Sequence, residues 1–150
     1  MRKNGVIARR ILGCILTLLM LSQSYALTIK YKLIITVVGL RSNQGKVYIS
    51  LYNSQEGFPT EPNKALRKSS VGIINGKATL TLDDLPEGVY AAACFHDEDN
   101  NGKLNTNFIG MPTEGIGASN DAKGFFGPPK YKDAAFSLRR DGVITIRIQY

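Results

Sequence analysis

An acidic, glycine-bearing segment near residue 100 has the residue types and spacing of a calcium loop. Its sequence is Asp97-x-Asp99-x-Asn101-Gly102-x-x-Asn105, with oxygen-bearing side chains at the first, third, fifth and ninth positions. Calcium loops place oxygen ligands at these positions, turn sharply at a glycine in the sixth, and use the carbonyl of the seventh. The predicted cofactor is calcium, and the predicted ligands are Asp97, Asp99, Asn101, the carbonyl of Lys103, and Asn105.

The twelfth position departs from this pattern. It holds Phe108, where an EF-hand has a bidentate glutamate, and no amphipathic helix flanks the segment. The segment is therefore not an EF-hand, and Asn107, Glu114 or a main-chain carbonyl would have to complete the coordination. Because the segment has few carboxylates, the expected affinity for calcium is weak, with a dissociation constant of order 10⁻⁴ to 10⁻³ M. A metal-free turn is the alternative, because Asp, Asn and Gly also form turns without an ion.

His96, which precedes the acidic segment, suggests a second kind of chemistry. It is the single histidine of the chain, which excludes a His-rich zinc or iron site. A hydrolase or other enzyme that uses His96, the acidic residues after it and Glu114 is the alternative function, although no residue is assigned as catalytic. A strand-end histidine that hydrogen-bonds the loop is the structural alternative. Cys94 lies in an apolar run, which favours a buried, unreactive thiol.

Aromatic residues gather in a later segment that is rich in glycine and proline. Phe125, Phe126 and Tyr131 could form an exposed platform, and the protein would then be a carbohydrate- or peptide-binding module. More often such rings pin a loop onto a sheet, and pinning is the interpretation we favour.

The segments that must position these residues have the sequence pattern of β-strands. Apolar and polar residues alternate, or apolar runs occur, in seven short segments: 28–37, 47–52, 67–74, 78–82, 89–95, 134–138 and 144–150. The first two look like a hairpin, and Asn75-Gly76 is a strong signal for another. Seven short strands without a convincing helix predict an all-β Greek-key sandwich, immunoglobulin-like or prealbumin-like, with a small barrel as the alternative.

Two local features refine this fold. Gly88-x-Tyr90 at the start of a strand resembles the tyrosine corner of Greek-key sandwiches. Residues 97–132 have no sustained period and form an unusually long loop, which is typical of a functional segment or one packed over the core. Residues 27–150 are predicted to form a single domain.

The first 26 residues have the order of regions found in secretory signals. A basic start precedes an apolar run at 11–21, and Ser24-Tyr25-Ala26 offers small residues for cleavage. Cys14 lies too early in the apolar run for a lipoprotein signal. Cleavage would remove four of the 19 basic residues and none of the 12 acidic ones, which leaves a net charge of +3. We therefore expect a periplasmic or secreted protein with no nucleic-acid partner and no stable membrane insertion after cleavage.

Several motifs resemble the bacterial domain-of-unknown-function family numbered 2141. They are DLPEGVY (84–90), FHDEDNNGKL (95–104), GMPTEG (110–115), GASN (117–120), FGPP (126–129) and DAAF (133–136). The resemblance extends roughly from residue 33 to 148 and implies an exported bacterial sandwich protein without implying an activity. One departure is that residues 98–101 read EDNN, where the family is closer to Asp-x-Asn-x-Asn-Gly. The function expected is therefore a non-enzymatic binding or structural module with a weak calcium loop.

Overall fold

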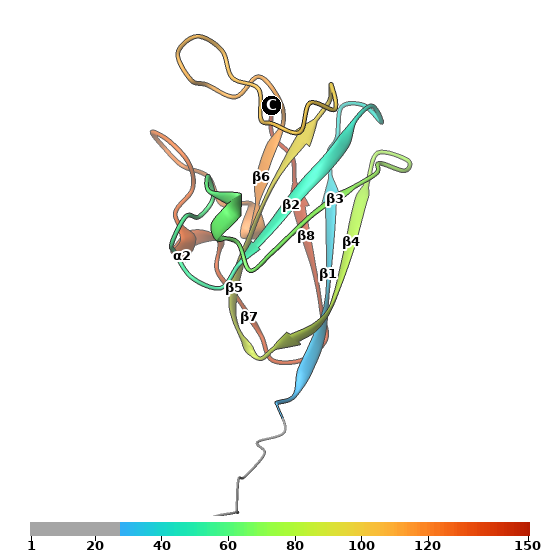
Figure 1. The fold of residues 1–150 in the computed structure, drawn as a ribbon, viewed down its shortest axis with the longest axis vertical. Helices are drawn as coiled ribbons and strands as arrows, with labels where there is room; N and C mark the ends of the chain where they lie inside the picture. The colour runs from blue at the N-terminus through green and yellow to red at the C-terminus, as the bar shows by residue number, and fades with distance from the viewer. Residues whose placement is uncertain (1–27) are drawn as a thin grey trace, which may run out of the picture.

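Two β-sheets pack face to face in the computed structural model, which describes residues 28–150 (Figure 1). The predicted signal peptide, residues 1–26, lies outside the described residues. No helix within residues 28–150 is both long enough and apolar enough to cross a bilayer. The prediction of an all-β sandwich is confirmed, with eight strands in the described part of the chain where about seven were expected.

The first sheet has three strands in the order β4-β1-β8. The central strand β1 (Lys30–Val38) pairs antiparallel with β4 (Ala78–Pro86) and parallel with β8 (Gly142–Arg147). Alternate residues of β1 are fully buried, because successive side chains of a strand point to opposite faces of the sheet. The first sheet therefore contributes one apolar face to the core.

The second sheet carries the candidate site. Its strands follow the order β3 (Arg67–Val71), β2 (Lys46–Tyr52), β5 (Gly88–Asp97) and β6 (Ile116–Ala118), and β7 (Phe136–Leu138) also pairs with β5. Most of β5 is buried on both faces, as predicted for a central strand. The core between the sheets includes Leu33, Ile35 and Val37 from β1 and Val47, Ile49 and Leu51 from β2.

The tyrosine corner is present at the start of β5. The Tyr90 hydroxyl donates a hydrogen bond to the Pro86 carbonyl over 2.7 Å, and the Tyr90 side chain is buried. Burial raises the pKa of this hydroxyl, which stays a donor at neutral pH. The bond ties the turn between β4 and β5 to the strand that leads to the acidic segment.

The prediction that the first two strands form a hairpin is wrong. β1 and β2 lie in different sheets, and their apolar residues meet across the core. Asn75-Gly76 does form the expected tight turn, with positive φ at both residues and two backbone hydrogen bonds between Ile74 and Lys77. The strands on either side of this turn nevertheless diverge, since β3 before it and β4 after it belong to opposite sheets.

Residues 97–132, predicted as one long loop, also contain short regular elements. β6 pairs with the end of β5, and it is followed by the 3₁₀ turn η2 (Ser119–Asp121); α2 (Tyr131–Ala134) begins at the far end of the segment. A further 3₁₀ turn, η1 (Pro62–Lys64), lies between β2 and β3. The segment is therefore held to the edge of the second sheet and leaves it as two projecting loops.

Candidate functional site

The acidic segment starts where β5 ends, against the beginning of β2. Asp97 is the last residue of β5 and pairs with Lys46 of β2. Gly45, the residue just before β2, has φ +74°, and a Cβ added there would collide with the Asp97 carbonyl. Glycine is required here because only it allows this conformation and this close approach. The backbone of Asp97 is thus fixed before the loop begins.

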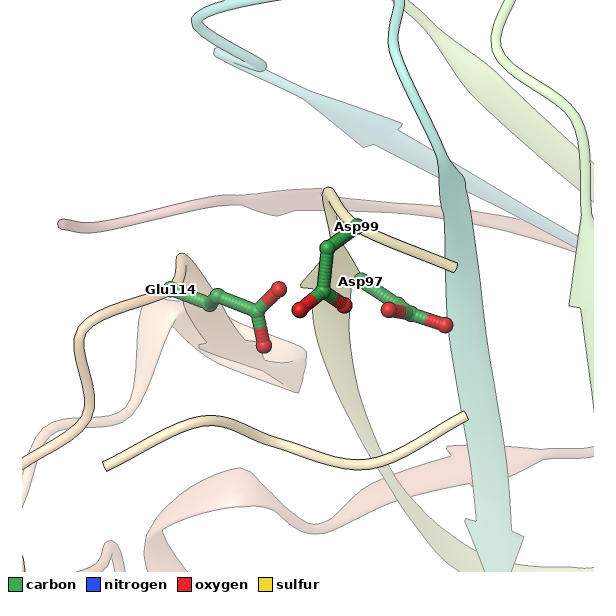
Figure 2. Close-up of side chains that lie close together, drawn as sticks. All are labelled: Asp97, Asp99 and Glu114. Atoms are coloured by element: carbon green, nitrogen blue, oxygen red, sulfur yellow. The ribbon is translucent and has the colours of Figure 1, made fainter. Parts of the chain in front are cut away.

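Three carboxylates converge beside this point. Oxygens of Asp97, Asp99 and Glu114 lie within 4.8 Å of one another. Figure 2 shows Glu114 reaching in from a separate segment, toward Asp99 and Asp97. Asp97 and Glu114 are buried, with 0% and 5% of their surface exposed, whereas Asp99 is open to solvent.

Backbone N–H groups satisfy both buried carboxylates. Asp97 accepts from the amides of Asn101 (3.1 Å) and Gly102 (2.9 Å), one on each oxygen. Glu114 accepts in the same way from the amides of Glu98 and Asn105, both at 2.9 Å. Such charge-assisted bonds offset part of the cost of burying a carboxylate. They also close the loop, because Glu114 bridges its beginning and its far side.

Two side-chain amides lie among the carboxylates. Asn101 donates through Nδ2 to Asp99 (2.9 Å) and to Asn105 Oδ1 (2.8 Å), and Asn105 donates to the same oxygen of Asp99 (2.9 Å). The Asn105 bond is the main cause that lowers the pKa of Asp99. No buried side-chain nitrogen or oxygen in residues 28–150 lacks a partner. A cation here would replace the amide donors, and both asparagines would have to turn their oxygens inward.

The predicted ligand residues are gathered in part. Asp97, Asp99, Asn101 and Asn105 are joined by direct hydrogen bonds, while Lys103 contacts the group through its amide, which donates to Asn101 Oδ1 over 2.7 Å. Of the residues considered to complete the site, Glu114 joins the cluster. Asn107 does not, because its Oδ1 accepts the amides of Ile109 and Met111 in the projecting loop. These two amides hold the tip of that loop in a closed turn.

His96 is buried and fully engaged. Its Nε2 lies 2.7 Å from the Gln44 carbonyl and its Nδ1 2.7 Å from the Tyr150 hydroxyl. A carbonyl can only accept, so Nε2 carries the proton and Nδ1 accepts from Tyr150 in the neutral ring. The Glu98 carboxylate is 3.8 Å from Nδ1, beyond hydrogen-bond reach. The structural interpretation of His96 therefore fits better than the catalytic one.

Glu98 is not part of the carboxylate cluster and pairs with Arg41. The guanidinium forms a two-point ion pair with Glu98, with Nε 3.0 Å from Oε1, and it also stacks 4.3 Å above the ring of Tyr150. The hydrogen bond from Arg41 holds the pKa of Glu98 below its ordinary value. The pair keeps the negative charge of Glu98 apart from the carboxylate cluster.

Cys94 is inert, as the sequence indicated. The thiol lies on β5 and is buried, and its burial raises the pKa to about 12. At neutral pH the group is therefore a thiol and not a nucleophilic thiolate.

The aromatic residues divide between two roles. Tyr131 packs edge-on against Phe58 at 5.8 Å and donates to the Val89 carbonyl, so it pins its segment to the sheet. The same prediction is wrong for Phe125 and Phe126, which are 93% and 96% exposed. Their exposure follows from a tight turn between Gly124 and Gly127, which points two consecutive side chains outward. Sequence alone offered no period from which to find this turn.

Comparisons with known proteins identify a family and no activity. A family model described as "Uncharacterized protein conserved in bacteria (DUF2141)" matches residues 35–147. A search of curated proteins gives no match. A search of solved structures finds a pilus-presented adhesin, Spy0125 (Cpa), that is 20% identical, with a TM-score of 0.25. That match covers 84% of this chain and 28% of the adhesin chain.

Proposed function

This chain belongs to the DUF2141 family of uncharacterised bacterial proteins, and we propose that it is an exported, non-enzymatic binding or structural module whose acidic loop binds calcium. Calcium binding by the loop, a structural role for His96, and export are the three properties proposed. Each is supported by different residues.

The observation that carries the calcium proposal is the convergence of Asp97, Asp99 and Glu114 within 4.8 Å. At an effective dielectric constant of about 20, the charges of the two buried members, Asp97 and Glu114, would repel each other by roughly 3 to 4 kcal/mol at that separation. A divalent cation would remove this repulsion.

The available donor set suits calcium in particular. Calcium takes six to eight oxygen ligands and tolerates irregular geometry. Three carboxylates, the amide oxygens of Asn101 and Asn105 once rotated, and the carbonyl of Lys103 would reach that number. The nitrogen and sulfur ligands that zinc prefers are not part of the group. Because the ion would replace existing hydrogen bonds, we expect the weak affinity of extracellular modules, of order 10⁻⁴ to 10⁻³ M.

The two hydrogen bonds of the buried His96 ring support a non-enzymatic role. A general base must reach a substrate proton, directly or through one water. Both nitrogens of His96 are held by Gln44 and Tyr150, and its side chain has 0% exposure. The hydrolase alternative would need this buried network to open first.

Export to the periplasm or the medium is supported by the basic, apolar and small-residue regions of residues 1–26. The net charge of +3 expected after cleavage gives no reason to invoke a nucleic-acid partner.

The exposure of Phe125 and Phe126 favours a second candidate, a carbohydrate- or peptide-binding module. Exposed rings can stack on a sugar face or on an apolar side chain. Titration with soluble oligosaccharides and peptides would detect this activity, and the Phe125→Ser/Phe126→Ser variant should abolish it.

Calorimetric titration with calcium chloride tests the main proposal directly. The wild-type protein should bind one ion, and Glu114→Gln should weaken binding at least tenfold by removing a buried carboxylate. Glu87→Gln is the matched control, since Glu87 is exposed in the turn between β4 and β5 and, within residues 28–150, its ion pair is with Arg139. Absence of binding heat in the wild type up to about 10 mM calcium, ten times the upper expected dissociation constant, would contradict the proposal.

A further inference from the structure

The loop between η2 and α2 presents two bare aromatic rings to solvent. Phe125 and Phe126 are 93% and 96% exposed and contact each other edge-on, with ring centroids 4.8 Å apart. The loop projects from the side of the sandwich near α2 (Figure 1). Adjacent, fully exposed phenylalanines form an apolar patch of the kind that marks an interaction surface.

The backbone that carries the rings is fixed at the feet and at the apex of this loop. At its two feet, Ser119 Oγ donates to the Ala134 carbonyl over 2.6 Å and Asn120 Nδ2 donates to the Ala135 carbonyl over 2.8 Å. At the apex, a Cβ on Gly124 would collide with the Gly127 carbonyl, so the turn is closed tightly. The backbone of the loop therefore loses little conformational entropy when the rings bind another surface.

Three lysines flank the rings in the sequence of the loop. Residues 122–132 contain Lys123, Lys130 and Lys132, all exposed. Acidic residues lie at the two ends of this segment: Asp121, which accepts a hydrogen bond from the Arg147 amide, and Asp133 in α2. None of the three lysines pairs with a carboxylate of residues 28–150. The loop thus combines an apolar tip with three exposed lysines that form no ion pair within residues 28–150.

We propose that residues 122–132 dock this protein on an anionic lipid surface. Aromatic rings insert at the headgroup boundary, while nearby lysines attract anionic headgroups. A sugar or a peptide is usually held in a concave site, whereas these rings stand at the apex of a projecting turn. The pocket found between β7 and β8 is lined by Leu33 and residues 136–144, so it does not include the rings. Docking of this kind is peripheral and requires no membrane-spanning segment.

A single tryptophan can report the insertion directly, because the chain contains none. Phe126→Trp should show a blue-shifted emission on vesicles that contain phosphatidylglycerol. The shift should be weaker on pure phosphatidylcholine and should be reduced by high salt. Ile74→Trp is the control reporter, since Ile74 is 75% exposed in the turn between β3 and β4, on the other side of the molecule in Figure 1. All variants keep the same N-terminal segment, so any binding through that segment is common to them.

Two double variants separate the apolar from the electrostatic contribution to vesicle binding. Phe125→Ser/Phe126→Ser should weaken vesicle binding about tenfold or more through loss of apolar burial. Lys130→Gln/Lys132→Gln should weaken it by about fivefold for each lysine and flatten its dependence on salt. Melting temperatures of both variants should stay at the wild-type value, because these side chains are exposed.

An unshifted Phe126→Trp spectrum on anionic vesicles would overturn the proposal. So would full vesicle binding by the double phenylalanine variant. If the emission of Phe126→Trp responds to soluble oligosaccharide or peptide but not to vesicles, the loop serves the second candidate function and not a membrane. The result is independent of the calcium loop, because vesicle binding can be measured in the presence of a chelator.

Discussion

Calcium should raise the melting temperature by an amount that follows from the expected affinity. A ligand that binds only the folded state stabilises it by RT ln(1 + [L]/Kd). With Kd between about 10⁻⁴ and 10⁻³ M, calcium at about 10 mM contributes roughly 1.4 to 2.7 kcal/mol. In a domain of this size, each kcal/mol moves the melting temperature by about 3 to 5 °C. The expected rise is therefore about 4 to 13 °C, well within the reach of calorimetry or circular dichroism.

Asp99→Asn is the sharpest variant for this measurement. Asp99 is exposed, and the one backbone amide it accepts, that of Asn101, also donates to Asp97. The calcium-free melting temperature should therefore remain close to that of the wild type, while the rise with calcium disappears. Asp97→Asn should lose the rise as well, but it also turns one acceptor oxygen of a buried carboxylate into an amide donor that faces the N–H of Asn101 or Gly102, at a cost of about 1 to 3 kcal/mol. Asp83→Asn is a matched control, because Asp83 is exposed on β4, in the other sheet.

Two results would refute this reasoning. The first is a melting curve of the wild type that does not change between chelator and about 10 mM calcium, the concentration at which linkage requires a shift. The second is an equal rise in Asp99→Asn and in the wild type, since the effect would then come from general salt and not from the carboxylate cluster. Either would leave the loop as a metal-free turn closed by its asparagine amides.

Two further predictions concern the residues around the site. The ion pair with Arg41 lowers the pKa of Glu98 from its ordinary value of 4.5. The pair therefore stabilises the fold above pH 4.5, and this stability is lost as the pH falls through the lowered pKa. In Arg41→Gln, the melting temperature should fall less steeply with decreasing pH than in the wild type. Gly45→Ala should lower the free energy of unfolding by several kcal/mol, because the added Cβ collides with the Asp97 carbonyl and the residue has a positive φ. Gly76→Ala also has a positive φ but open space around it, so it should lower that free energy by only about 1 to 2 kcal/mol. Urea unfolding of both variants measures the difference.

Alternation predicts which residues face the core and not which strands are neighbours. Leu33 and Val47 are apolar positions of the alternating segments 28–37 and 47–52, and both are buried. The same pattern arises whether two strands pair along their edges or face each other across the core, so β1 and β2 were assigned to a hairpin that does not exist. Tyr90 was predicted correctly because its corner is local: donor and acceptor are four residues apart.

The candidate site divides in the same way. The spacing from Asp97 to Asn105 is a local property of one turn, so the sequence was enough to bring these residues together. Glu114 lies beyond a projecting loop, and its place is set by the start of β6 against β5, a tertiary relation that no spacing encodes. The partners of His96 are similarly remote, since Tyr150 is 54 residues away and Gln44 is 52.

The parallel pairing of β1 with β8 has a consequence for how the protein reaches its folded state. β1 is the middle strand of its sheet, and the contact between Lys32 and Asp141 spans 109 residues. Until β8 is available, one long edge of β1 has no partner, and contacts of such high sequence separation form slowly. A chain still emerging from a ribosome or threading a translocation channel therefore cannot complete the first sheet. Slow closure of this kind would keep the chain unfolded for the export that we propose.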